Sequence, residues 1–357
     1  MKVTSFKIYR YRLPLKSPVL IRGRNQIRLR QGFILYLTLD NSWQGFGEIA
    51  PLKDFEGVEI EGLANSLRQF GKGLVQREFP DDLEGLFCYL DSSSLIPEAR
   101  FGVETAVYNA LALKLKKPLS FLWGKSPSSS VMVNGLLQEE EPLKEAVKEL
   151  LKKGFESIKL KAGGAVKKDI ARVREVLALL NNRSRIHIDV NQRWSYDDAI
   201  RFAGEIDCAR LEYIEEPFWD MEKAADFFHK TGIAIALDES LFTPQGKAVK
   251  ISDGVKAWVL KPMLLGGPRK ALVMADEARK RGLEIVVSSA FESGIGLFSL
   301  IHLAAALGAN CRAGIDTLKY FEKDLLKTPD VIQEGKISVP KRQLSESDIR
   351  FEILSEV

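Results

Sequence analysis

Two lysines stand two positions apart in the short segment SIKLK, residues 157–161. In an extended strand alternate side chains share a face, so Lys159 and Lys161 should project together while the residues between them face the other way. A neighbouring ammonium group disfavours the charged form, and we therefore expect Lys159 to lower the pKa of Lys161. A lysine with a lowered pKa can remove a proton, so the pair predicts base chemistry.

Four more charged residues end the short apolar segments that follow: Asp189, Glu215, Asp238 and Lys261. From Lys161 onward they recur at intervals of 23 to 28 residues, which is about the length of one strand plus one helix. Each one alone has a structural explanation, because Asp238, for example, would cap a following helix. Together with the lysine pair they predict a shared site, with a structural salt-bridge network as the alternative.

Three of these residues, Asp189, Glu215 and Asp238, are carboxylates supplied by three consecutive segments. An all-oxygen ligand set suits a hard divalent cation, Mg²⁺ in the first place and Mn²⁺ in the second. Lys161 comes before this trio and Lys261 after it, so the two amines should stand on opposite sides of a bound ligand. Such a site fits removal of a proton next to a carboxylate of a small-molecule substrate.

The elements that position these charges are eight short apolar segments between residues 131 and 316, alternating with helical patterns. This alternation is typical of a parallel (β/α) TIM-type barrel, an α/β fold in which chemistry lies at the carboxyl ends of the strands. A doubly wound open sheet shares much of the pattern and is the alternative.

The rest of the chain predicts a second module of α+β type, with strand-like segments followed by helical patterns. A connection rich in Pro, Ser and Gly covers residues 116–130. We therefore expect an N-terminal capping domain over 1–127, a barrel over 128–317, and a segment over 318–357 that returns to the cap. In that last segment YFEKDLLKTP predicts a helix and GKISVP a strand.

The composition excludes several classes of protein. The 357 residues are 45% apolar, which suffices for a large core, and 52 basic against 48 acidic residues predict neither a nucleic-acid nor a membrane surface. Cys88, Cys208 and Cys311 form no C-x-x-C pair, which argues against a disulfide framework or a zinc site and favours a reducing cytoplasm. No apolar stretch is long enough to span a bilayer, so we expect a soluble protein.

At its charged residues the sequence resembles the enolase superfamily. The motifs are K-x-K at Lys159 and Lys161, D-x-N at Asp189 and Asn191, E-E-P from Glu215, D-E-S from Asp238, and K-P at Lys261, all in the superfamily's order. The resemblance covers nearly the whole chain and implies a barrel under a capping domain. It implies that the three carboxylates, with Glu215 rather than Glu216, hold Mg²⁺ or Mn²⁺. It also implies that Lys161 acts as base and acid while Lys261 stabilises an enediolate.

Within the lysine-pair, muconate-lactonising branch, three segments most resemble the o-succinylbenzoate synthase family: WQGFGEIAPL, VVSSAFESGIG (286–296) and GIDTL (314–318). This implies a Mg-dependent lyase of menaquinone biosynthesis, which dehydrates 2-succinyl-6-hydroxy-2,4-cyclohexadiene-1-carboxylate to o-succinylbenzoate. The ESGIG motif also resembles N-succinylamino acid racemases, so racemisation or another lysine-pair epimerase reaction stays open. Alternatives of other classes are a Schiff-base aldolase with Lys261 as nucleophile and a barrel that only binds a carboxylate ligand.

Substrate contacts are expected from Asn191, from Ser288 and Ser289 after the seventh barrel segment, and from Gly314 after the eighth. The segment PVLIRGRNQIRLR, residues 18–30, should form a loop of the cap that shapes specificity, with a plain mobile loop as the alternative. Its arginines, Arg22, Arg24, Arg28 and Arg30, form the densest basic cluster of the chain, which predicts a solvated strand and loop unless the cluster borders the site.

Overall fold

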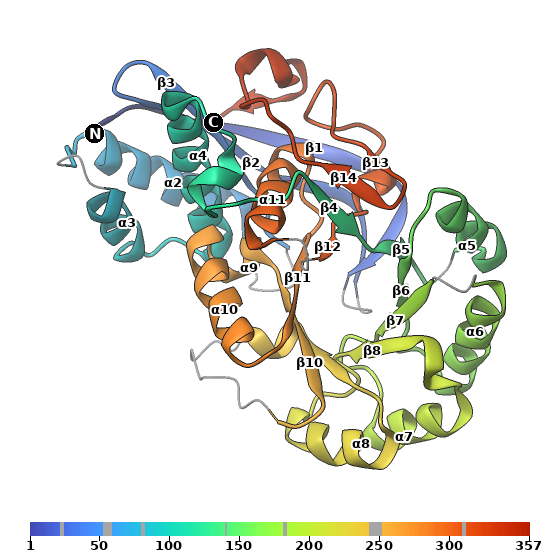
Figure 1. The fold of residues 1–357 in the computed structure, drawn as a ribbon. Helices are drawn as coiled ribbons and strands as arrows, with labels where there is room; N and C mark the ends of the chain where they lie inside the picture. Colours follow the sequence, from blue (N-terminus) through green and yellow to red (C-terminus); the bar gives the residue numbers. More distant parts are fainter. Residues whose placement is uncertain are drawn as a thin grey trace.

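The structure of the chain is a computed structural model, and two sheets organise it (Figure 1). It describes residues 1–21, 25–52, 59–79, 83–139, 141–180, 184–242, 252–308 and 312–357. The N-terminal part and the red C-terminal tail lie together on one side of the molecule, and the barrel occupies the other (Figure 1).

The capping sheet is antiparallel and consists, among the described residues, of β1 (Val3–Ile21), β2 (Asn25–Leu39), β3 (Trp43–Ile49) and β15 (Ser355–Glu356). Its helices are α2 (Ile60–Val75), α3 (Leu83–Asp91) and α4 (Pro97–Leu115). Two glycines of β3 let α4 approach closely, because a Cβ at Gly45 or Gly47 would stand 1.9 Å from a carbonyl oxygen of α4. The N-terminal module therefore contains both the strands and the helices that the sequence predicts.

The barrel strands are β4 (Ser130–Val133) with β5 (Gly135–Leu137), β6 (Ser157–Lys161), β7 (Arg185–Asp189), β8 (Leu211–Glu215), β9 (Ile235–Leu237), β10 (Val255–Leu260), β11 (Glu284–Ser288) and β12 (Arg312–Gly314). Parallel pairing runs in chain order from β5 to β12, and β12 then pairs with β4. Asn134 alone separates β4 from β5, so the ladder closes on itself. The predicted barrel is confirmed, and the open-sheet alternative is wrong.

The helices that accompany the barrel are α5 (Leu143–Lys152), α6 (Val166–Leu179), α7 (Tyr196–Glu205), α8 (Ala224–Thr231), α9 (Pro262–Leu265), α10 (Pro268–Lys280) and α11 (Gly294–Leu307). Helix α11 is buried along nearly its whole length because it packs against both β3 of the cap and the barrel strands. Across the part of the chain that the structure describes, no helix is both long and apolar enough to cross a membrane.

The C-terminal tail differs in part from the prediction. YFEKDLLKTP is not a helix: after one turn at Leu318–Tyr320 it runs extended, because partners far along the chain take its amides, as when Glu322 donates to the Pro14 carbonyl. GKISVP forms β14 (Lys336–Ser338), which pairs with β13 (Ile332–Gln333) and β4. Strand β15 pairs with β1, so the tail does return to the cap, while the three domain boundaries stay a prediction.

The segment 18–30 is a β-hairpin rather than a loop in its described part. Register pairs join Val19 to Ile27 and Ile21 to Asn25, because β-branched residues on both arms favour pairing. Residues 22–24, which include Arg22 and Arg24, lie outside the described residues.

Candidate functional site

The three predicted metal ligands lie at neighbouring strand ends and are inaccessible to solvent. Asp189 ends β7, Glu215 ends β8, and Asp238 follows β9, with exposed fractions of 0%, 1% and 0%. The parallel register sets Asp189 directly beside Glu215. The helix-cap explanation for Asp238 is wrong, because its side chain makes no capping bond to the short helical turn that follows.

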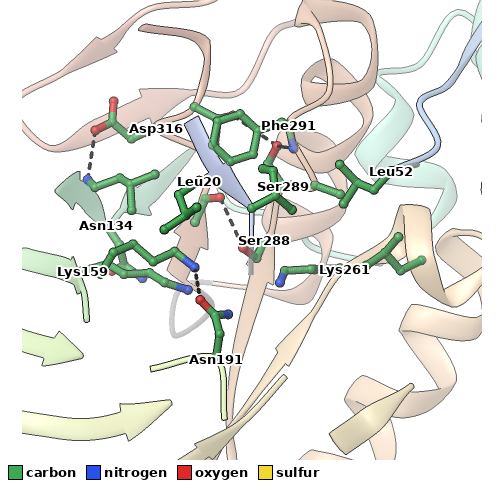
Figure 2. A pocket seen from close by; sticks show the side chains of 17 residues that line it. Leu20, Leu52, Asn134, Lys159, Asn191, Lys261, Ser288, Ser289, Phe291 and Asp316 are labelled. Atoms are coloured by element: carbon green, nitrogen blue, oxygen red, sulfur yellow. Dashed lines mark hydrogen bonds between the residues drawn. The ribbon is translucent and has the colours of Figure 1, made fainter. Parts of the chain in front are cut away.

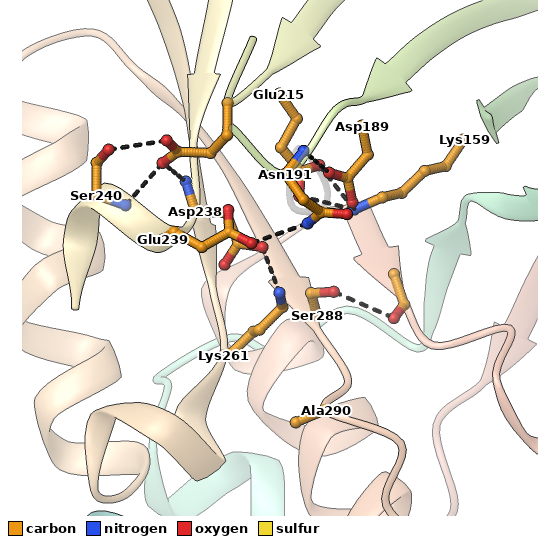
Figure 3. A network of polar contacts seen from close by, with 12 residues as sticks. Lys159, Asp189, Asn191, Glu215, Asp238, Glu239, Ser240, Lys261, Ser288 and Ala290 are labelled. Atoms are coloured by element: carbon orange, nitrogen blue, oxygen red, sulfur yellow. Dashed lines mark hydrogen bonds and ion pairs between the residues drawn. The ribbon is translucent and has the colours of Figure 1, made fainter. Parts of the chain in front are cut away.

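The predicted lysines contact these carboxylates, and Figure 3 shows Lys159 and Lys261 pointing at them. The Lys159 Nζ atom lies 2.8 Å from Asp189 Oδ2 and 2.7 Å from Glu215 Oε2. The Lys161 Nζ atom lies 2.6 Å from Asp189 Oδ2 and donates to Asn191 Oδ1 at 2.9 Å, and Lys261 forms an ion pair with Asp238. All six predicted charges therefore meet at one place, and the salt-bridge alternative describes part of their arrangement.

The carboxylates at the strand ends raise the pKa values of two of the predicted lysines. Burial lowers the pKa of Lys159, but the carboxylates of Asp189 and Glu215 outweigh it and hold that pKa well above its usual value. The pKa of Lys261 is also raised, since Asp238 and Glu239 outweigh the effect of burial. The carboxylates therefore favour the ammonium form of Lys159, and its predicted influence on Lys161 stays a prediction.

The three carboxylates supply the oxygen ligands that a divalent cation prefers, although in this structure they are not close enough together to coordinate one. Within the described ranges no three Asp, Glu, His or Cys side chains are grouped so that they could hold a metal ion, and the Lys159 ammonium group contacts both Asp189 and Glu215. The Asp238 Oδ1 atom is buried with no hydrogen-bond partner in the described structure, which leaves a hard oxygen donor free. A cation held by Asp189 and Glu215 would compete with Lys159 for their oxygens.

Glu216 holds the backbone next to Asp238 in place, a role that the sequence did not predict. Its buried carboxylate accepts bonds from the amides of Asp238 at 2.8 Å and Ser240 at 2.7 Å, and from Gln192 Nε2 at 2.7 Å. The backbone is left-handed at Asn191, Gln192 and Glu216, with φ of 50°, 61° and 44°. Such conformations persist where surrounding bonds impose them, often at functional sites. The second glutamate of the E-E-P motif could have indicated this supporting role.

A pocket opens above these charges, and most predicted residues line it (Figure 2). The lining includes seven predicted residues: Lys159, Lys161, Lys261, Asn191, Ser288, Ser289 and Gly314. Lys261 enters the pocket from the side opposite Lys159 and Asn191 (Figure 2). Of the described residues of the cap, Leu20, Ile21 and Leu52 line the pocket, and all three are apolar.

The two predicted serines are not equivalent. Among the described residues, Ser288 Oγ makes only a long contact of 3.4 Å, to the Gly314 carbonyl, and is available to a ligand. Ser289 Oγ donates its proton to Glu292 Oε2 at 2.5 Å and accepts bonds from the Phe291 amide and from Thr317 Oγ1. Ser289 is therefore engaged within the protein, and its predicted direct contact with substrate stays a prediction.

Asn134 is a pocket residue that the sequence analysis missed. It interrupts the first barrel strand, is 2% exposed, and lines the pocket. Its amide oxygen and nitrogen are buried without a hydrogen-bond partner among the described residues. An amide inside the apolar segment VMVNGL was the signal, because a buried amide needs a partner.

Two family models match this chain. The model described as "Enolase C-terminal domain-like" matches residues 142–343, and the model described as "MenC, N-terminal domain" matches residues 3–109. The first match alone covers more than half of the chain and includes every predicted catalytic and metal-binding residue.

Curated relatives extend over both modules. An o-succinylbenzoate synthase from Aliivibrio salmonicida is 30% identical over 322 residues, which cover 89% of this chain and 92% of that protein. The chloroplastic protein PHYLLO of Arabidopsis thaliana is 31% identical over 313 residues, or 78% of this chain, and the match spans only 18% of that much longer protein.

Solved structures share the fold. N-succinyl Arg/Lys racemase from Bacillus cereus superposes with a TM-score of 0.85 at 22% identity, with all of both chains covered. A dipeptide epimerase from Cytophaga hutchinsonii, complexed with Mg and the dipeptide D-Ala-L-Val, superposes with a TM-score of 0.85 at 22% identity over 100% of this chain and 99% of that one. The family model, the relatives and the barrel agree, and this chain belongs to the enolase superfamily.

Proposed function

We propose that this enzyme is a lyase that dehydrates 2-succinyl-6-hydroxy-2,4-cyclohexadiene-1-carboxylate to o-succinylbenzoate. The observation that carries the proposal is one pocket with Lys161 and Lys261 in its wall and three buried carboxylates beside it. Relatives of about 30% identity over nearly their whole length are named o-succinylbenzoate synthase, which supports this substrate.

Asp189, Glu215 and Asp238 would hold the divalent cation, Mg²⁺ or Mn²⁺. When bound, the cation would offset the negative charge that develops on the substrate carboxylate as the neighbouring proton leaves. The Mg in the dipeptide epimerase complex is in keeping with this assignment. EDTA treatment should abolish turnover, and added Mg²⁺ or Mn²⁺ should restore it. Full activity after EDTA would reject the cation.

The lysines would divide the proton transfers. In this proposal Lys161 removes the ring proton next to the carboxylate and returns it to the departing hydroxyl, so that water leaves and the ring becomes aromatic. The ammonium group of Lys261, on the other side of the pocket, stabilises the negative charge of the enediolate. Lys159, which contacts Asp189 and Glu215, would share their oxygens with the cation and help to hold both carboxylates in place.

The direct test is conversion of that cyclohexadiene to o-succinylbenzoate, followed by the absorbance of the aromatic product. We expect saturable, cation-dependent turnover. A folded, cation-loaded enzyme that does not convert this cyclohexadiene would reject the proposed reaction; affinity for the carboxylate without turnover of any candidate substrate would favour the ligand-binding alternative.

Racemisation of N-succinyl amino acids is the second candidate. Lys161 and Lys261 line one pocket and come from β6 and from the end of β10, which three strands separate, so the two amines approach a ligand from different directions, as proton exchange on both faces of a carbon requires. The Bacillus cereus racemase shares the fold. Loss of the α-deuteron from N-succinyl amino acids, without any dehydration, would favour this activity. The Schiff-base alternative has less support, because three buried carboxylates lie beside the lysines and a Schiff-base enzyme has no need for a metal-binding set. Borohydride trapping with carbonyl substrates would detect it.

A further inference from the structure

Arg30 of the capping sheet is a buried cation whose observed bonds all go to backbone oxygens. It is 3% exposed on β2. Its Nε atom donates to the Phe291 carbonyl at 3.0 Å, its Nη1 atom to the Pro51 carbonyl at 2.5 Å, and its Nη2 atom to the carbonyls of Ala50 and Ala290. The prediction of a solvated residue is therefore wrong for Arg30, which is fully enclosed.

These four carbonyls belong to two separate walls of the pocket. Ala50 and Pro51 follow β3 and lead directly to Leu52, which lines the pocket. Ala290 and Phe291 follow β11 and line the pocket themselves. One planar guanidinium group thus fixes the distance between a wall of the cap and a wall of the barrel.

The barrel wall has a conformation that needs such support. Phe291 has a φ of 64°, in the left-handed region that bulky residues rarely adopt. Its amide donates to Ser289 Oγ at 2.9 Å and its carbonyl accepts from Arg30, so bonds hold the strained peptide on both sides. Ser289 is held in turn by Glu292.

A second buried charge of the cap holds the end of the same segment. Glu48 of β3 is 0% exposed and accepts bonds from the Ser293 amide at 3.0 Å, from Ser293 Oγ at 2.6 Å and from the Gly296 amide at 2.9 Å. Residues 290–293 are therefore attached to the cap at both ends, by a cation and by an anion.

We propose that Arg30 is a positioning residue that sets substrate fit by holding residues 290–293 of the barrel against the cap. The proposal rests on the proposed function for its substrate, but the attachment itself does not depend on which reaction occurs. Lysine in place of Arg30 keeps the charge but cannot reach four carbonyls with one planar group. The wall should then loosen while the charges at the strand ends stay in place.

The test compares Arg30→Lys with Arg12→Lys, which replaces an exposed arginine on the neighbouring strand β1 of the same sheet. We expect Arg30→Lys to raise KM about tenfold with kcat changed less than about threefold, since the wall contributes to binding and not to proton transfer. Hydrogen exchange of the peptide covering 288–296 should become faster in Arg30→Lys alone. Mn²⁺ affinity, measured by electron paramagnetic resonance, should match the wild type in both variants.

Unchanged exchange over 288–296 in folded Arg30→Lys would overturn the proposal, as would an unchanged KM. If the wild type fails to dehydrate the cyclohexadiene while Arg30→Lys still speeds exchange, the proposed function fails and the positioning role stands. Should Arg30→Lys not fold, Glu48→Gln tests the same attachment, because it weakens the bonds to the Ser293 and Gly296 amides and leaves the N-cap bond of Ser293 to α11 in place. Faster exchange in that peptide is then expected, and unchanged exchange would reject the attachment.

Discussion

Two ionic clusters lie at opposite ends of the barrel strands, a partly exposed one at the base and a buried one at the mouth. At the base, where the strands begin, Glu212 accepts bonds from Arg312 at 2.7 and 2.8 Å and from Ser157 at 3.0 Å. At the mouth, where the strands end, Glu215 accepts bonds from Lys159 at 2.7 and 2.8 Å. Glu212 and Glu215 both belong to β8, so a single strand serves both clusters.

The same strand gives its two carboxylates opposite properties. Burial raises the pKa of Glu212, but His187 and Arg312 outweigh this and lower it to about 2. Burial and the nearby Asp189 hold the pKa of Glu215 well above its usual value, although Lys159 opposes them. At the base the nearby cations outweigh burial, whereas at the mouth burial and a neighbouring carboxylate outweigh the effect of Lys159 on Glu215. Buried charge alone does not mark a functional site; a carboxylate beside a pocket whose pKa is shifted against its ion pair is a stronger indication.

The largest expected contrast is between glutamine substitutions at these two positions. Glu215→Gln should lower kcat/KM by on the order of 10³-fold or more, because it removes a ligand of the proposed cation. Glu212→Gln should leave kcat/KM within about threefold, since no reacting group lies at the base. Steady-state kinetics and Mn²⁺ titration check both variants, with circular dichroism to confirm the fold. Comparable activity losses in two folded variants would contradict the distinction between mouth and base.

The next contrast is between two of the lysines at the mouth, Lys161 and Lys261. Lys161→Ala removes both proposed proton transfers and should lower dehydration by about 10³-fold. Lys261→Arg keeps a cation that cannot act as a base, so part of the dehydration should survive. Product affinity must be measured as well, because the larger arginine can displace the substrate. If Lys161→Ala retains substantial dehydration while Lys261→Arg binds normally without turnover, the roles are reversed.

The mouth could be predicted from the sequence because its residues follow a period. Charges at the ends of Ile158–Lys161 and the later strands recur with the strand-plus-helix repeat, and the barrel places equal positions of each repeat side by side. The lining role of Ser288 followed in the same way, since it ends β11.

Residues without such a period could not be predicted. Arg30 lies in a basic segment whose composition indicates a solvated surface, and only the packing of the cap against residues 290–293 buries it. The same holds for YFEKDLLKTP, where distant partners such as Pro14 overrule a local helical preference. The base cluster could not be predicted either. Ser157, Glu212 and Arg312 lie at the start of three strands, β6, β8 and β12, that are not neighbours in the sheet.

Stability against acid should distinguish the base cluster from the mouth. The folded pKa of Glu212, about 2, lies below its unfolded value, so its contribution is complete above pH of about 4.5 and is lost as the pH falls toward 2. Glu212→Gln should lower the free energy of unfolding by roughly 1–3 kcal/mol at pH 7, with the difference shrinking over that window. Urea titrations at pH 7, 4 and 3 check this. A deficit that is the same at each pH would contradict the ionic explanation.

The smallest contrast uses one serine from each end of the barrel. Ser157 begins β6 and donates to Glu212, whereas Ser288 ends β11 and faces the pocket. Ser157→Ala should cost about 1 kcal/mol of unfolding free energy and leave KM unchanged, because it removes one bond far from any ligand. Ser288→Ala should raise KM about tenfold, because the hydroxyl group is free to bind a substrate carboxylate. It should have little effect on stability, since among the described residues this hydroxyl makes only the 3.4 Å contact to the Gly314 carbonyl. Denaturant titrations and steady-state kinetics on both variants give the comparison. An unchanged KM in Ser288→Ala would remove this serine from the binding site, and a raised KM in Ser157→Ala would show that the base influences the mouth through β6.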